Sequence, residues 1–227
     1  FGFFSFLLIS GFGRNIFHLG WRSQVFTFTG LVLLFFILRR IEKYPKAYLF
    51  LPILFLIWAN LHGGFILGLV FLGFSVIQHV VSKNWKILRY LVPATLASTL
   101  VTMINPYGIT VYNEVLRHSQ YPLWGLIAEW VRPAVEVKIA IIFLAFLGAF
   151  LFFRRQKKEG VFWILGIIFS AYLAFDAKRH IPIFVLVLAL AMLDNFRERL
   201  LQLEKNILVK KLSAVVIGVG IIFFALW

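Results

Sequence analysis

The chain has 227 residues, of which 62% are hydrophobic and only 14% are charged, with a formal net charge of +14. A soluble domain of this length cannot bury so much apolar surface, so the composition excludes an ordinary soluble core, a disordered chain and a fibrous repeat. There is no cysteine, which excludes a disulfide framework, a thiolate metal site and a thiol nucleophile.

Apolar segments follow one another along the chain, separated by short polar stretches. A membrane-spanning helix needs roughly 20 apolar residues, and about 17 are acceptable. Nine segments come close to this, near residues 1–13, 23–39, 47–61, 64–82, 90–104, 138–153, 161–176, 181–195 and 211–227. The sequence therefore predicts an all-α fold, a polytopic transmembrane helical bundle with about nine membrane segments in one integral-membrane domain over 1–227. Both ends lie inside apolar runs, so we expect a fragment of a longer membrane protein.

The polar stretches alternate between a strongly basic set and a weakly basic set. The strongly basic stretches hold 16 of the 23 Lys and Arg and lie at 39–46, 82–89, 154–158 and 194–211. The positive-inside rule places these stretches in the cytoplasm and the other set outside. The last of them, 194–211, is expected to be a cytoplasmic amphipathic linker. Because topology accounts for the basic residues, nucleic-acid binding is not expected.

The turn Trp58-Ala-Asn-Leu-His-Gly-Gly64 interrupts a long apolar run. Two consecutive glycines let the backbone reverse, so the sequence predicts a helical hairpin with its turn on the outer face. Asn60 and His62 then lie where water or headgroups reach them. His62 is a candidate donor to a phosphate or acceptor from a hydroxyl, and the plainer interpretation is a turn residue bonded to local carbonyls.

Residues 105–137 form the one long outer loop. Asn105-Pro-Tyr-Gly108 ends the fifth segment, because proline lacks a backbone donor and glycine permits a turn. Apolar residues then recur at helical spacing between Ile109 and Leu116, with polar residues between them. This pattern predicts a short amphipathic helix lying on the membrane surface.

The turn Asp176-Ala-Lys-Arg-His180 has four ionisable side chains between two apolar segments. Lys178, Arg179 and His180 suit a phosphate or pyrophosphate held at headgroup depth, with Arg binding through its two-pronged fork. The alternative is that these side chains reach lipid phosphates and only anchor the helices.

Two other outer positions carry candidate binding residues. Arg22 and Gln24 begin the second segment and either point into a cavity or anchor the helix at the interface. Glu129-Trp130 places a carboxylate beside an aromatic ring, as in many sugar sites, where the acid takes hydroxyl protons and the ring stacks on the sugar. Its plainer interpretation is a surface Glu paired with Arg132.

Several catalytic signatures are missing from the sequence. It has no phosphate-binding Walker loop, no dinucleotide glycine fingerprint, no zinc-type His/Cys spacing and no serine elbow of the hydrolase type. The dependence on a divalent metal is left open.

Four motifs occur in order: Trp21-Arg-Ser-Gln-Val-Phe26, the Trp58–Gly64 turn, Ile104-Asn-Pro-Tyr-Gly108 and Glu129-Trp130. In these the chain resembles a group of large bacterial inner-membrane proteins, mostly of unassigned function. That group is similar in layout to the GT-C glycosyltransferases, such as protein O-mannosyltransferases and oligosaccharyltransferases. The resemblance implies transfer of a sugar from a polyprenyl-phosphate carrier at the outer leaflet of a bacterial cytoplasmic membrane. GT-C members carry an essential acid in the first outer loop, whereas 13–23 contains no Asp or Glu.

The leading hypothesis is therefore a membrane glycosyltransferase whose partners are the bilayer and a lipid-linked sugar. Its expected catalytic residues are Glu129 as base, Asp176 as second candidate and His62 as accessory donor. The expected substrate-binding residues are Arg22, Gln24, Asn60, Trp130, Lys178, Arg179 and His180. Two alternatives stay open: a transporter or flippase of lipid-linked sugars or other anions, and a non-catalytic membrane scaffold.

Overall fold

The structure is a computed structural model that describes residues 24–41, 43–120, 130–155 and 160–204. Within these ranges the chain is helical and has no strand, so the all-α prediction is confirmed. The elements are α2 (Gln24–Ile41), the 3-10 helix η1 (Pro45–Leu49), α3 (Phe50–Leu61), α4 (Phe65–Val81), α5 (Trp85–Val101), α6 (Thr110–Gln120), α7 (Val135–Arg155), α8 (Gly160–Asp176), the 3-10 helix η3 (Lys178–His180) and α9 (Ile181–Glu204).

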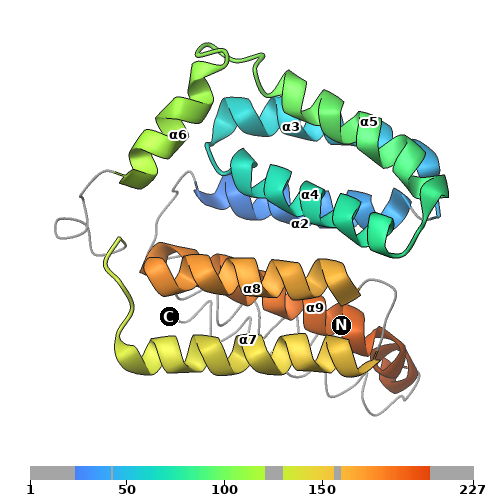
Figure 1. The fold of residues 1–227 in the computed structure, drawn as a ribbon, viewed down its shortest axis with the longest axis vertical. Helices are drawn as coiled ribbons and strands as arrows, with labels where there is room; N and C mark the ends of the chain where they lie inside the picture. Colours follow the sequence, from blue (N-terminus) through green and yellow to red (C-terminus); the bar gives the residue numbers. More distant parts are fainter. Residues whose placement is uncertain (1–23, 42, 121–129, 156–159, 205–227) are drawn as a thin grey trace, which may run out of the picture.

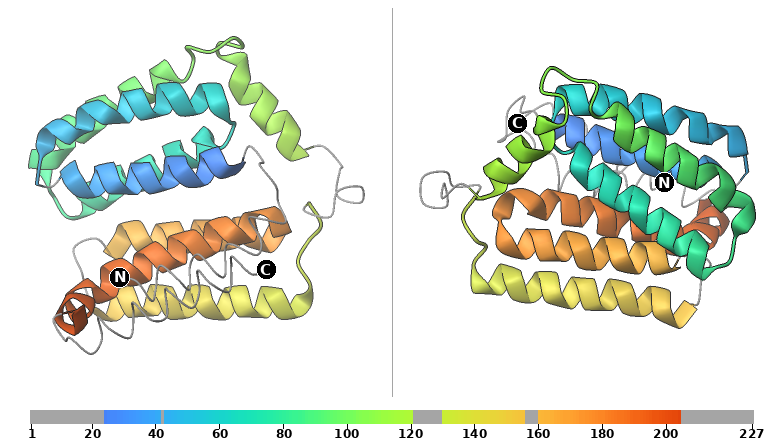
Figure 2. Two further views of the ribbon diagram at one scale, coloured as in Figure 1. Left: turned by 180° about the vertical axis from the view of Figure 1, so that it is seen from behind. Right: turned by 45° about the horizontal axis from the view of Figure 1, so that its top comes forward.

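The helices form two layers (Figure 1). The first layer contains α2 to α5, and the second contains α7 to α9. The short α6 lies at one end of the first layer, where the chain passes toward the second. Across the layers α4 packs against α8, and the same arrangement is seen from behind in Figure 2.

Aromatic side chains fill the space between the two layers. Phe35 of α2 contacts Phe71 of α4 edge to face, with ring centroids 5.2 Å apart, and lies 5.7 Å from Trp163 of α8. Gly166 of α8 leaves room for this cluster, since a Cβ there would lie 2.9 Å from the ring of Phe71. Burial of these large rings contributes apolar stabilisation between the layers.

Polar side chains join the layers at one end of the bundle, in a group that we call the clasp: Arg39, Gln78, Trp163 and Asp194. Arg39 at the end of α2 is ion-paired with the buried Asp194 of α9. The indole Nε1 of Trp163 donates to Asp194 Oδ2 over 3.0 Å, and Gln78 Oε1 accepts from the backbone N–H of Phe162 over 3.1 Å. Charge pairing and hydrogen bonds thus compensate the burial of a carboxylate.

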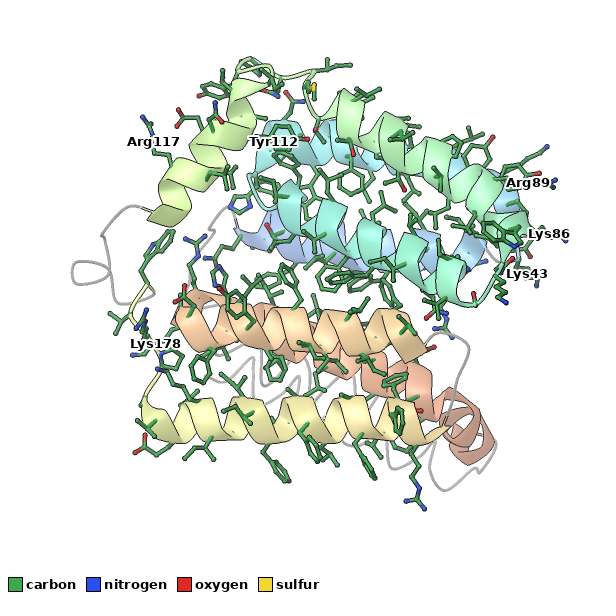
Figure 3. The ribbon with its side chains drawn as sticks, viewed as in Figure 1. Lys43, Lys86, Arg89, Tyr112, Arg117 and Lys178 are labelled. Carbon is green, nitrogen blue, oxygen red and sulfur yellow. The ribbon has the colours of Figure 1, made fainter. Side chains whose placement is uncertain are left out.

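Charged residues in and near the connecting turns lie at the two ends of the bundle. Lys43, Lys86 and Arg89 lie at the clasp end, whereas Arg117 and Lys178 lie at the opposite end (Figure 3). This separation agrees with the alternation of polar stretches along the sequence.

The expected number of about nine membrane segments is not supported. In the described part of the chain three helices are long and apolar enough to cross a membrane, namely Gln24–Ile41, Val135–Arg154 and Lys178–Phe196. The apolar helices Pro45–Leu61, Phe65–Val81 and Gly160–Asp176 are shorter. A helix of 17 residues such as α4 is about 26 Å long, less than a hydrocarbon core of about 30 Å. The segments 1–13 and 211–227 lie outside the described residues.

Two connecting regions differ in how they match the expectations. The helix predicted inside 105–137 is confirmed as α6, and the turn before it forms as expected, with Gly108 at φ +54° and the Tyr107 N–H donating to Asn105 Oδ1 over 2.7 Å. In the segment 194–211, expected as a linker, α9 continues to Glu204, and its Asp194 is buried.

Candidate functional site

A cavity of about 730 Å³ lies between the layers at the end opposite the clasp. Its walls come from the start of α2, the α3–α4 turn, α6, residue 130 and the α8–α9 turn. Six of the ten residues expected from the sequence line it: Gln24, Asn60, His62, Trp130, Arg179 and His180. The α3–α4 and α8–α9 turns therefore converge on one space with the start of α2, as a helical bundle with alternating hairpins allows.

His62 ends α3 and is held by its Nδ1 atom. The backbone N–H of Gly64 donates to this nitrogen over 3.1 Å, and the hydroxyl of Thr27 on α2 lies 2.6 Å from it. A backbone N–H can only donate, so Nδ1 is the acceptor and the ring proton sits on Nε2. Burial, and then the nearby Arg179 guanidinium, lower the pKa of His62, which keeps the ring neutral at pH 7.

The glycines of this turn are required by close approach and not by backbone reversal, since neither Gly63 nor Gly64 has a positive φ. A Cβ on Gly64 would collide with the Thr27 hydroxyl and lie 2.9 Å from His62 Nδ1. A Cβ on Gly63 would lie 2.9 Å from the side chain of Val115 on α6. The two glycines thus let α2 and α6 close around the histidine.

Trp58 of the same motif is part of the core. Its side chain is only 2% exposed. The indole lies between Gly30 of α2 and Gly68 of α4, and a Cβ on either glycine would come within 2.5 Å of the ring. Trp58 therefore sets the spacing of α2, α3 and α4 beneath the cavity.

Arg179 is the one cationic side chain among the described residues that line the cavity. Its guanidinium lies 3.9 Å from the centroid of the Trp130 ring, a cation–π contact that holds the planar group in one orientation. Its Nε is buried and has no hydrogen-bond partner among the described residues. Arg179 therefore lines the cavity as a partly buried cation with one donor unsatisfied among the described residues.

His180 follows Arg179 and has the opposite hydrogen-bonding pattern to His62. Its Nδ1 lies 3.1 Å from the carbonyl oxygen of Leu173 on α8. A carbonyl can only accept, so Nδ1 carries the proton, and in the neutral ring Nε2 has a lone pair. Burial of the ring, and then the adjacent guanidinium, oppose a positive charge on His180.

The two amides of the expected site have different surroundings. Gln24 begins α2, and its buried Oε1 has no hydrogen-bond partner among the described residues. Asn60 donates from Nδ2 to the carbonyls of Leu56 and Ile104, each over 2.8 Å. The Asn60 N–H groups thus join α3 to the end of α5, whereas the Gln24 acceptor is unsatisfied among the described residues.

The other four expected residues do not line the cavity in the described structure. Asp176 lies 3.8 Å from Arg132 in an exposed ion pair. Lys178 is exposed, and its backbone N–H donates to the carbonyl of Val131 over 3.1 Å. Arg22 and Glu129 lie outside the described residues.

Two lining residues, Thr27 and Glu114, were not expected as site residues. Thr27 lies one helical turn after Gln24, so the helical period would have placed both on one face. Glu114 lies on α6 and pairs with Arg117 over 2.8 Å. It was recognisable as an acid on the amphipathic helix, but the sequence did not show that α6 closes over the hairpin turn.

Tyr112 holds α6 in this position. Its hydroxyl lies 2.5 Å from the hydroxyl of Thr102 at the end of α5, and its ring packs edge to face on Phe65 of α4. Within the described residues no group of three or more His, Cys, Asp or Glu side chains is arranged to hold a metal ion.

Comparison with protein-family models and with curated proteins finds no match to the chain.

Proposed function

We propose that the chain is a membrane glycosyltransferase that takes its sugar from a polyprenyl-phosphate carrier, and that the cavity binds the phosphate and sugar of this lipid. The observation that carries the proposal is the Arg179 side chain, fixed against Trp130 with its Nε unsatisfied among the described residues. A buried donor without a partner is costly. A phosphate oxygen would satisfy it through a charge-assisted hydrogen bond.

The size and lining of the cavity support a ligand of this kind. Its volume of about 730 Å³ lies in the range of roughly 300–1,000 Å³ that is usual for small-ligand sites. Polar side chains such as those of Gln24, His62 and Arg179 share the lining with apolar side chains such as those of Leu61, Ile66 and Val111. An amphiphile with a charged phosphate and an apolar tail has the same two parts.

The distribution of charge supports the orientation. Lys43, Lys86 and Arg89 lie at the clasp end, which the positive-inside rule assigns to the cytoplasm. The cavity then opens toward the outer leaflet of a bacterial cytoplasmic membrane.

The reaction assigns definite tasks to the cavity. The acceptor oxygen forms a bond to the anomeric carbon while the bond from that carbon to the phosphate oxygen breaks, and the electron pair stays on the phosphate. Arg179 neutralises the charge that develops there. The acceptor proton goes to a base, and Glu114 is the one carboxylate among the described lining residues.

Native mass spectrometry of the purified chain with added polyprenyl monophosphate tests the proposal. We expect wild type to retain the lipid and Arg179→Gln to lose at least about 10-fold in affinity, because a hydrogen-bonded charge is removed. Arg89→Gln removes one exposed cation from the clasp end and is the matched control. Equal losses in the two variants, or no binding by wild type, would contradict the proposal. Transfer of label from polyprenyl-phosphoglucose or polyprenyl-phosphomannose then tests the reaction.

A further inference from the structure

The two histidines of the cavity face it with opposite hydrogen-bonding character. His62 Nδ1 accepts from the Gly64 N–H, so this ring can offer only the Nε2–H donor. His180 Nδ1 donates to the Leu173 carbonyl, so the neutral ring can offer only the Nε2 lone pair. In both cases the backbone sets the tautomer.

These tautomers divide the lining into donors and acceptors. Arg179 Nε and His62 Nε2 are donors, and only donors stabilise a phosphate oxygen at neutral pH. The acceptors are His180 Nε2 and the unpartnered Gln24 Oε1. A lone pair repels a phosphate oxygen but accepts a hydrogen bond from a hydroxyl. The phosphate-binding role expected of Arg179 therefore fits its donors, whereas the same role expected of His180 does not fit its acceptor.

We propose that His62 binds the phosphate of the lipid together with Arg179, and that His180 binds a hydroxyl of the sugar through Nε2. The inference rests on the proposed function and adds which part of the ligand each histidine recognises. It makes His180 a residue that determines specificity for a glycosylated lipid over the bare polyprenyl phosphate.

Asparagine tests these tasks without removing the structural hydrogen bonds. In His62→Asn the Oδ1 atom lies near the former Nδ1 and accepts from Gly64 and Thr27, while the Nε2–H donor is lost. In His180→Asn the Nδ2 group donates to the Leu173 carbonyl, while the Nε2 acceptor is lost. Each variant thus deletes the edge of the ring that faces a ligand.

The measurement is the affinity of wild type and both variants for polyprenyl monophosphate, polyprenyl-phosphoglucose and polyprenyl-phosphomannose. His62→Asn should weaken binding of the bare phosphate lipid about 10-fold, because a bond to a charged group is lost, and His180→Asn should leave it unchanged. His180→Asn should weaken binding of the preferred glycosylated lipid about 3- to 10-fold, the effect of a neutral hydrogen bond.

The outcomes separate this inference from the proposed function. Suppose that wild type binds the phosphate lipid and that both variants weaken this binding equally. The two histidines then do not bind different parts of the ligand, so the inference is wrong while the proposed function stands. The same holds if wild type binds neither glycosylated lipid more tightly than the bare phosphate lipid. If wild type binds none of the three lipids, both proposals are wrong.

Discussion

At His62 the burial of the ring and the positive charge of Arg179 act in the same direction. Both lower the pKa of the imidazole below 6.5, and the Gly64 N–H would have to give up its acceptor if Nδ1 took a proton. The folded chain therefore resists protonation at a position where the unfolded chain accepts a proton readily.

This difference predicts a pH dependence of stability. As pH falls below 6.5, the unfolded state binds a proton at His62 that the folded state does not bind, so the free energy of unfolding decreases. His62→Asn removes this titration and should lose less stability than wild type between pH 7.5 and 5.5. The check is thermal unfolding in detergent at both pH values. A gap in Tm that stays constant would contradict the shift assigned to His62.

At the scale of single helices, α4 contains two glycines with opposite surroundings. A Cβ on Gly68 would meet the Trp58 ring at 2.5 Å, whereas a Cβ on Gly73 has nothing within 4 Å. Gly68→Ala should destabilise the chain by about 1–3 kcal/mol, because the buried indole cannot move without displacing α2 or α3. Gly73→Ala should stabilise it by up to about 1 kcal/mol through helix propensity.

The comparison of these two variants is internally controlled, since both make the same substitution in one helix. Thermal unfolding followed by circular dichroism gives the sign of each change. If both variants change Tm in the same direction, the close packing of Trp58 on α4 is not the cause.

The elements also show what the sequence could and could not predict. Hairpins of similar length return to the same end of a bundle, so the convergence of His62, Arg179 and His180 followed from the order of turns. Hydropathy alone does not distinguish a short apolar helix such as α8 from a membrane span, which explains why the expected number of segments is not supported. The burial of Trp58 depends on glycines of two other helices, and no local pattern encodes that contact.

At the scale of the whole molecule, the clasp is the polar connection between the layers. Asp194→Asn keeps an oxygen for the Trp163 indole but removes the charge that pairs with Arg39. We expect a loss of about 1–3 kcal/mol, below the usual cost for a fully buried pair because Arg39 is 40% exposed and can regain water.

The exposed pair between Arg117 and Glu114 provides the control for this prediction. Arg117 is 65% exposed, so Arg117→Gln should change stability by at most about 1 kcal/mol. Urea or thermal unfolding of both variants in one detergent measures the difference. Equal effects would mean that the clasp contributes no more than a surface ion pair.

Because the clasp holds one end of α2, a small rotation of this helix about Arg39 produces a large displacement at its other end. Gln24 at the cavity and Arg39 at the clasp lie on the same helix, 15 residues or about 22 Å apart. A tilt of about 5° around Arg39 would displace Gln24 by about 2 Å, whereas a binding site tolerates only about 0.5 Å. A change in the tilt of α2 against the second layer, for example through a change in bilayer thickness, therefore displaces one wall of the cavity. This displacement changes how well the cavity fits its ligand.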